Sequence, residues 1–245
     1  MDMIRIAIQA KGRLNEESCL LLRDAGITID EAKRKFLGKA ADFPLEVLYL
    51  RDDDIPEVVA DGSADIGIVG LNEVEETGAG VKILRRLGFG NCRLSLAIPK
   101  GEDYPGLSYF DGKAIATSYP NILRKYLEEN GIKASIREIK GSVEIAPAAG
   151  IADAIFDIVS SGGTLVSNGL KEVETVLHSE AVLIAGPDLP KDKLELIDAV
   201  LFRFDSVTLS RGKKYILMNL PAKAVEEAVK ILPAMRSPTA MQTPS

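Results

Sequence analysis

Three hydroxyl residues and two glycines stand together in one short segment of this 245-residue sequence, Ser160-Ser161-Gly162-Gly163-Thr164. Glycines let backbone amides converge, and the hydroxyls can donate hydrogen bonds to the same anion. The apolar run Ala154–Val159 comes directly before the segment and predicts a buried strand of a parallel sheet. We therefore expect residues 160–164 to form a phosphate-binding loop, with an ordinary turn as the alternative.

An acidic residue on the predicted strand supports a phosphate site. Asp157 lies three residues before the loop, where its carboxylate can accept hydrogen bonds from sugar hydroxyls or face a metal-linked ligand. Phosphate followed by ribose is the ligand order that this arrangement predicts.

A second segment has the same design. The tetrapeptides Gly62-Ser63-Ala64-Asp65 and Gly150-Ile151-Ala152-Asp153 each lead into an apolar strand that ends at a glycine-containing turn. Ligands of open parallel sheets bind beyond the carboxyl ends of the strands. The repeat therefore predicts two similar α/β lobes that face each other across a cleft, with chance similarity as the alternative.

Strands and helices alternate over most of the chain, which indicates an α/β fold with substantially parallel sheets. The strands are predicted at Ile4–Gln9, Leu45–Leu50, Ile66–Val69, Val81–Leu87, Arg93–Ile98, Ala114–Thr117, Ile132–Ile139 and Ala154–Val159. The helices are predicted at Glu16–Asp24, from about Pro56 to Gly62, and at Asn121–Asn130. Asp54 and Ser118 are candidate N-caps for the last two helices.

The last segment of the sequence differs in character. A strand at Tyr215–Leu220 and a helix at Ala222–Leu232 are predicted, followed by a stretch that three prolines interrupt. One strand and one helix cannot bury their apolar faces alone, so this segment must dock on the lobes, pair with another subunit, or begin a further domain.

Composition narrows the function classes. Hydrophobic residues make up 46% of the chain and charged residues 27%, with a net charge of −6, which argues against broad nucleic-acid binding. No amino-terminal apolar run approaches the ~20 residues of a membrane span, and Cys19 and Cys92 form no metal-type cluster or disulfide framework. We expect a cytoplasmic protein without a membrane partner.

Small anionic substrates need only local positive charge. The candidates at predicted strand-to-loop positions are Lys11, Arg13, Arg51 and Arg93, each of which is otherwise a solvated surface charge.

With these residues in hand, the chain resembles the ATP phosphoribosyltransferase family of the long type, nearly from end to end. The segment Gly141–Leu165, followed by Asn168-Gly169-Leu170, carries the specific part of the resemblance. The other carriers are Lys11-Gly12-Arg13-Leu14, Arg51-Asp52-Asp53-Asp54-Ile55-Pro56, Asp65–Gly70, Cys92–Leu96 and Ala116–Pro120.

The resemblance implies a fold and a reaction. The fold is α/β, with two periplasmic-binding-protein-like (type II) lobes around a cleft and the start of a ferredoxin-like C-terminal domain. Residues 1–92 with about 181–212 would form lobe I, residues 93–180 lobe II, and residues 213–245 a partial regulatory-type domain. The reaction transfers the phosphoribosyl group of phosphoribosyl pyrophosphate to N1 of ATP, with Mg²⁺ and release of pyrophosphate, as the first step of histidine biosynthesis.

The resemblance also implies site residues. Phosphoribosyl pyrophosphate would bind Asp153, Asp157, Ser160, Ser161, Gly162, Gly163, Thr164 and Leu165. ATP would bind Lys11, Gly12, Arg13, Arg51, Gly70, Asn72, Arg93, Ser118 and Tyr119. Asp157 and Glu144 would be catalytic, Glu144 as a base for the exocyclic amine, although it can equally bond backbone amides or substrate hydroxyls. The only histidine, His178, is expected to be a surface or packing residue.

Family members of this type form dimers and, on inhibition, hexamers, with AMP and histidine as possible inhibitors and no separate regulatory subunit. Because the chain ends soon after the resemblance to the regulatory domain begins, the sequence does not decide whether histidine inhibits this protein. The rival hypothesis is a non-enzymatic binding module, since two lobes around a cleft also describe solute receptors and effector-sensing domains. Turnover of ATP with phosphoribosyl pyrophosphate distinguishes the two.

Overall fold

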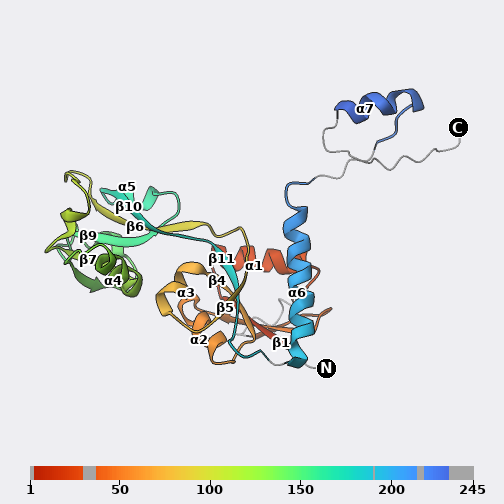
Figure 1. Ribbon diagram of the computed structural model, residues 1–245, viewed down its shortest axis with the longest axis horizontal. Coiled ribbons are helices and arrows are strands. Elements are labelled where there is room, and N and C mark those ends of the chain that lie inside the picture. The colour runs from red at the N-terminus through yellow and green to blue at the C-terminus, as the bar shows by residue number, and fades with distance from the viewer. Residues whose placement is uncertain (1–2, 30–36, 190, 214–217, 232–245) are drawn as a thin grey trace. The chain divides into compact units, whose positions relative to one another are not determined.

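The computed structural model of this protein describes residues 3–29, 37–189, 191–213 and 218–231 (Figure 1). The chain divides into two units, Met1–Leu209 and Ser210–Ser245. The first unit contains two separate β-sheets with helices packed on them. None of the helices in the described ranges is both long enough and apolar enough to cross a bilayer.

The first sheet has six strands in the order β2-β3-β1-β4-β11-β5. Their bounds are β1 Ile4–Gln9, β2 Leu37–Lys39, β3 Leu45–Leu50, β4 Ile66–Gly70, β5 Lys82–Arg86 and β11 Ala181–Ala185. Strand β1 runs parallel to β3 and β4, whereas β2, β11 and β5 pair in the antiparallel direction.

Helices cover both faces of this sheet because its strands are apolar on both sides. The helices are α1 Arg13–Asp24, α2 Ile55–Ala60, α3 Leu71–Thr77 and α6 Lys191–Ser210. Ile4, Ile6 and Ile8 share one core with α1 and α6, whereas Val69 and Ile184 share the other with α2. These two cores hold the carboxyl ends of β1, β3 and β4 in a fixed arrangement.

The second sheet has five strands in the order β10-β6-β9-β7-β8. Their bounds are β6 Cys92–Pro99, β7 Ala114–Thr117, β8 Ser135–Glu138, β9 Ala154–Val159 and β10 Leu170–Ser179. Strand β7 is parallel to β8 and β9, and β6 is antiparallel to β9 and β10. The helical elements here are α4 Pro120–Glu129, α5 Gly163–Ser167 and the short 3₁₀ turns η3 Leu107–Phe110 and η4 Val143–Ile145.

The predicted α/β class is confirmed, but the sheets are mixed rather than mostly parallel. The chain passes from the first sheet to the second between β5 and β6 and returns between β10 and β11 (Figure 1). Strands β6 and β11, which enter a sheet after each crossing, run against its parallel strands, and this accounts for their antiparallel ladders. The ladder between β2 and β3 is a separate antiparallel pair.

Three local predictions need correction. No side-chain bond from Asp54 caps α2, whose first turn follows the 3₁₀ turn Asp52–Asp54 directly. Ser118 is not the N-cap of α4; its Oγ donates to the carbonyl oxygen of Ile139 at 2.7 Å, and Tyr119 stands at the cap position. Strand β8 is shorter than predicted, because it begins at Ser135 and residues 132–134 form an irregular connection after α4.

The second unit contains a 3₁₀ turn at Ala222–Ala224 and helix α7 at Val225–Ile231. The predicted strand Tyr215–Leu220 lies partly outside the described residues, and its described part, residues 218–220, forms no strand. A strand needs a hydrogen-bonded neighbour, and no strand ladder of the described chain includes residues 218–220.

The repeated tetrapeptides have the same backbone geometry. Asp65 donates its amide to the carbonyl oxygen of Arg5 at 2.9 Å, and its carboxylate accepts the Arg5 amide at 2.8 Å. Asp153 forms the same reciprocal pair with Ala114, with both distances 2.8 Å. Each aspartate thus anchors the start of its strand to the neighbouring parallel strand, so the two lobes share a supersecondary design.

Candidate active site at the junction of the two sheets

The parallel strands of the first sheet bring several predicted site residues to one edge. Strands β3, β1 and β4 point the same way, so the segments that follow them lie at a common edge of the sheet. These segments hold Lys11, Gly12 and Arg13 after β1, Arg51 after β3, and Gly70 and Asn72 at the end of β4 and the start of α3.

The second sheet does the same for the remaining residues. Ser118 and Tyr119 follow β7, and residues 160–164 follow its parallel neighbour β9. Because β6 is antiparallel to β9, its second residue, Arg93, lies directly opposite Val159 and next to the loop. Most of the predicted residues therefore lie at these two sheet edges.

The backbone amides of the glycine-serine loop are free. In the described part of the chain, the amides of residues 161–165 donate no hydrogen bond, and the first amide that donates is that of Val166, to the carbonyl oxygen of Gly162. Gly162 has a φ of +80°, in the left-handed region that favours glycine. Successive free amides around such a residue can bind an anion.

Asp157 lies beside this loop without a cationic partner among the described residues. Its carboxylate accepts the adjacent Ile158 amide at 2.8 Å, and its nearest cross-strand residue on β6 is Ser95. Burial, together with repulsion from Glu144, raises the pKa of Asp157 to about 6. A half-buried carboxylate with unused acceptor capacity is suited to accept hydrogen bonds from a diol.

A buried polar network joins the two sheets. The hydroxyl of Tyr119 donates to Oε1 of Glu73 at 3.0 Å, and the side-chain amide of Asn72 donates to the same oxygen at 2.7 Å. Asn72 also exchanges hydrogen bonds with Ser179, at the point where β10 returns toward the first sheet. The bond between Glu73 and Tyr119 therefore fixes α3 of one sheet to the start of α4 of the other.

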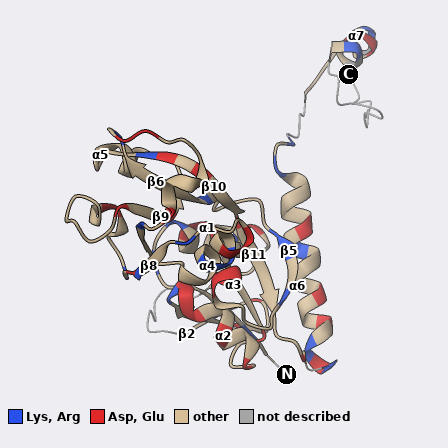
Figure 2. Ribbon diagram, turned by 60° about the vertical axis from the view of Figure 1, so that its left-hand side comes forward, with Lys and Arg blue, Asp and Glu red and all other residues tan. Residues whose placement is uncertain are grey.

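Two features of this network explain its composition. A Cβ atom on Gly70 would lie 2.3 Å from Oδ1 of Asn72, so only glycine at position 70 permits this orientation of the amide. Burial, followed by repulsion from Asp52, raises the pKa of Glu73 to about 7, and burial beside Glu73 also raises the pKa of Tyr119. Acidic residues are prominent on α3 (Figure 2).

Sequence reasoning missed Glu73. As one of several acidic residues on an amphipathic segment, it resembled a solvent-exposed helix residue, yet it is only 7% exposed. The available signal was its position directly after Asn72, at the start of the helix that follows a buried parallel strand.

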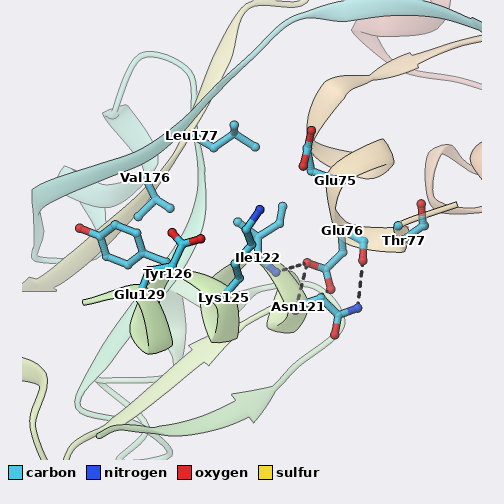
Figure 3. Close-up of a pocket in the computed structure, with 11 residues that line it drawn as sticks. Glu75, Glu76, Thr77, Asn121, Ile122, Lys125, Tyr126, Glu129, Val176 and Leu177 are labelled. Carbon is cyan, nitrogen blue, oxygen red and sulfur yellow. Dashed lines mark hydrogen bonds between the residues drawn. The ribbon is translucent and has the colours of Figure 1, made fainter. Parts of the chain in front are cut away.

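A cavity of about 420 Å³ lies between α3, α4 and β10 (Figure 3). At its edge, the carboxylate of Glu76 accepts the backbone amides of Asn121 and Ile122 at 2.9 and 3.0 Å, in the first turn of α4. The side chain of Asn121 donates to the carbonyl oxygen of Glu76 at 2.9 Å. None of the predicted substrate residues lines this cavity, so it is not the predicted substrate site.

The basic residues of the first-sheet edge are exposed. Arg51 forms a bidentate pair with Asp53 at 2.9 and 3.0 Å, which raises the pKa of Arg51, and Arg13 lies 3.5 Å from Glu17. Gly12 has a φ of +100°, which lets the chain turn from β1 into α1. These side chains are accessible to an anionic ligand.

Not every predicted residue reaches the two edges. Asp153 precedes β9 whereas the loop follows it, and six strand residues at ~3.3 Å each place Asp153 about 20 Å from the loop. The structure gives it the anchoring role described above.

Leu165 is buried in the core, and Gly163 has no positive φ, so Gly162 is the glycine that the loop geometry requires. His178 is exposed on β10.

Among the described residues, no group of three or more His, Cys, Asp or Glu side chains is arranged to hold a metal ion.

Comparison with family models connects this geometry to known proteins. Residues 51–206 match the model described as ATP phosphoribosyltransferase, and residues 210–243 match the model of the C-terminal domain of the same family. An ATP phosphoribosyltransferase of Parabacteroides distasonis is 60% identical over 237 residues, which is 97% of this chain and 84% of the relative.

Solved structures agree. A chain of the ATP phosphoribosyl transferase (HisG:HisZ) complex from Thermotoga maritima is 30% identical, with a TM-score of 0.73 over 84% of this chain and 98% of that one. A putative periplasmic sulfonate-binding protein of Methylobacillus flagellatus is 16% identical, with a TM-score of 0.58 over 94% of this chain and 72% of that one. This second likeness concerns the fold alone.

Proposed function

Because the chain belongs to the ATP phosphoribosyltransferase family, pentosyltransferases of the first step of histidine biosynthesis, we propose that residues 160–164 bind the 5′-phosphate of phosphoribosyl pyrophosphate. Asp157 accepts hydrogen bonds from the ribose hydroxyls. The observation that carries this assignment is the run of free amides at residues 161–165 beside a carboxylate without a cationic partner in the described chain.

ATP binds at the edge of the first sheet in this proposal. Lys11, Arg13 and Arg51 supply positive charge for its phosphates. The positive φ of Gly12 shapes the turn that carries Lys11 and Arg13, and Gly70 makes space for the side-chain amide of Asn72. Asn72 and Tyr119 are only 4% and 9% exposed and are bonded to Glu73 and to each other at the junction of the sheets, so in this proposal they support the nucleotide site from beneath.

The chemistry needs positioning more than a covalent nucleophile. The bond between the anomeric carbon and pyrophosphate breaks, pyrophosphate leaves with the electron pair, and adenine N1 forms the new bond to the anomeric carbon. Positive charge then develops on the ribose, which the carboxylate of Asp157 stabilises. Alignment of two bound substrates supplies up to ~7 to 11 kcal/mol in ideal cases. Glu144, half-buried on η4 and close enough to repel Asp157, is our proposed acceptor for the amine proton.

Mg²⁺, when bound, would neutralise charge on the leaving pyrophosphate. It typically binds through one or two carboxylates and substrate phosphates rather than a dedicated protein cage. The carboxylate of Asp157 and the hydroxyls of Ser160, Ser161 and Thr164 lie at the carboxyl end of β9 and would suit this mode of binding.

Two variants test the assignment. Gly163→Val should abolish binding of phosphoribosyl pyrophosphate, because its branched side chain would occupy space among the free amides of residues 161–165. The fold should stay intact, since a Cβ atom at position 163 would meet only Ser161 Oγ at 3.7 Å. Asp157→Asn should weaken sugar binding more than ATP binding. Calorimetric titration of each ligand with each variant gives the result, and retained affinity in Gly163→Val would refute the role of the loop.

Turnover separates an enzyme from a binding module. Incubation of the wild-type protein with ATP, phosphoribosyl pyrophosphate and Mg²⁺ should release pyrophosphate and change the ultraviolet spectrum of the adenine. A folded protein that binds both ligands without turnover would be a binding module instead.

We further propose a cytoplasmic homo-oligomer of the long type, a dimer that forms hexamers on inhibition by histidine, with AMP as a second inhibitor. The match of residues 210–243 to the family's C-terminal domain supports the long type without a separate regulatory subunit. Native mass measurement with and without histidine tests the assembly, and a mass that histidine leaves unchanged would contradict regulated association.

A further inference from the structure

A carboxylate outside all the predicted site residues controls the arginine nearest the loop. Glu172 of β10 accepts two hydrogen bonds from Arg93, from Nε and from Nη2, each at 2.5 Å. Its Oε1 also accepts the hydroxyl of Ser95 at 2.7 Å. The remaining terminal nitrogen of Arg93, Nη1, donates to the carbonyl oxygen of Ser160 at 3.2 Å.

The strand order places Arg93 and Ser95 between two carboxylates, those of Glu172 and Asp157. Strand β6 lies between β10, which carries Glu172, and β9, which carries Asp157. Ser95 is directly opposite Asp157, and Arg93 is directly opposite Val159, so Arg93 and Asp157 are diagonal neighbours on one face of the sheet. Diagonal neighbours are ~7 to 8 Å apart, within reach of a long side chain.

The pKa values of the two carboxylates differ in the direction that this arrangement predicts. Hydrogen bonds from Arg93, and then from Ser95, lower the pKa of Glu172 to about 2 against the effect of burial. Asp157 receives neither group, and its pKa is raised rather than lowered. The bidentate pair with Glu172 therefore leaves Asp157 without a guanidinium partner.

The fixed arginine also orients the loop. The carbonyl of Ser160 is held by Arg93, and the free amides begin with the next residue, Ser161. A carbonyl oxygen turned toward a bound phosphate would repel it, so the restraint on Ser160 favours the anion-binding orientation.

We propose that Glu172 is a positioning residue for the phosphoribosyl site, which holds the guanidinium of Arg93 on the Ser160 carbonyl and away from Asp157. The inference rests on the proposed function of the loop and of Asp157. Without Glu172, Arg93 turns to Asp157, neutralises it, and blocks the position of the sugar diol.

Steady-state kinetics of four variants test this role. Glu172→Ala should raise the KM for phosphoribosyl pyrophosphate at least tenfold and change the KM for ATP less than twofold, because Arg93 lies at the loop and not, as the ATP assignment implied, with the basic residues at the edge of the first sheet. Glu172→Gln, which keeps one acceptor, should lie between this variant and the wild type. Glu174→Ala is the matched control, because Glu174 lies on the same strand but accepts the hydroxyl of Tyr104 at 2.8 Å instead. The double variant Glu172→Ala, Arg93→Met should regain part of the lost affinity, since no guanidinium is left to occupy Asp157.

The double variant separates positioning from structural damage. The proposal is overturned if the KM of the double variant for phosphoribosyl pyrophosphate is equal to or higher than that of Glu172→Ala. It is also overturned if Glu172→Ala has the same KM as Glu174→Ala. Thermal melts of all four variants identify any that do not fold.

A ligand-free measurement keeps the inference separate from the proposed function. NMR titration of the Asp157 carboxyl carbon should show a pKa that falls toward or below the ordinary value of 3.8 in Glu172→Ala and rises again in the double variant. An unchanged Asp157 titration in folded Glu172→Ala, or in folded Glu172→Gln if the alanine variant does not fold, would refute the inference even if the loop binds phosphate. If the wild type binds no phosphoribosyl pyrophosphate but the titration shifts as expected, the proposed function fails and the arrangement of Arg93 stands.

Discussion

Replacement of the buried Glu73 by glutamine should remove most of the pH dependence of stability near neutrality. The pKa of Glu73 is about 7 in the folded protein, against an ordinary value of 4.5, because burial and nearby negative charge disfavour its ionised form. Between these two pH values the folded state binds a proton that the unfolded state has lost. Stability is therefore greatest below pH 4.5 for this group and declines as the pH rises through 7.

The size of the effect follows from the same values. A difference between 4.5 and about 7 is worth ~3 kcal/mol in full, of which about 2.5 kcal/mol should be lost between pH 5 and pH 8. Glutamine keeps Oε1 as an acceptor for Tyr119 and Asn72, so Glu73→Gln removes the titration without removing the network. Asp157 contributes in the same direction and sets the residual slope.

The assay is urea unfolding, followed by circular dichroism, at half-unit steps from pH 5 to pH 8. The free energy of unfolding of the wild type should fall more steeply than that of Glu73→Gln, with a difference of about 2.5 kcal/mol accumulated across the range. Glu174→Gln is the control, since Glu174 accepts a hydrogen bond from Tyr104 and from no residue of the Glu73 network. Parallel curves for the wild type and Glu73→Gln would refute the assignment of a protonated Glu73 at the junction.

Three further predictions concern the helix junction, the loop and the strand anchor. Glu76→Ala should lower the free energy of unfolding by ~1 kcal/mol in urea titration, because Glu76 of α3 caps the first turn of α4. Glu75→Ala, at an exposed position, should change it by no more than ~0.5 kcal/mol. Equal effects of the two variants would contradict this cap between α3 and α4. Gly162→Ala should lower the affinity for phosphoribosyl pyrophosphate and cost ~1 to 2 kcal/mol of stability, because position 162 is left-handed, and Gly163→Ala should cost much less stability; the reverse order would contradict the loop geometry. Asp153→Ala should lower the melting temperature by a few degrees, at ~1 kcal/mol and roughly 2 to 4 °C per kcal/mol, without changing the KM for phosphoribosyl pyrophosphate, and a selective rise in that KM would show that Asp153 reaches the ligand after all.

Local patterns in the sequence predicted many of the elements up to residue 159 and much of the chemistry, but they did not predict β10, β11 or α6. The strands at residues 4–9, 45–50, 114–117 and 154–159 have the predicted bounds, because continuous apolar runs bounded by glycine and polar turns leave few alternatives. Residue types at fixed spacing predicted the glycine-hydroxyl loop after β9, the aspartate within that strand, and the repeat at Asp65 and Asp153. The anchoring role of these two aspartates came from the structure.

Tertiary structure alone decided which groups are paired and which are free. Glu172 and Asp157 are both acidic residues on strands, yet the position of β6 between their strands gives Arg93 and Ser95 to Glu172 and leaves Asp157 unneutralised. Glu73 became the link between the sheets only because the chain crosses twice and brings α3 against α4. Hydrogen-bond partners distant in sequence depend on strand order and burial, and neither is encoded in local periodicity, so the sequence identified the chemical groups and the fold assigned their roles.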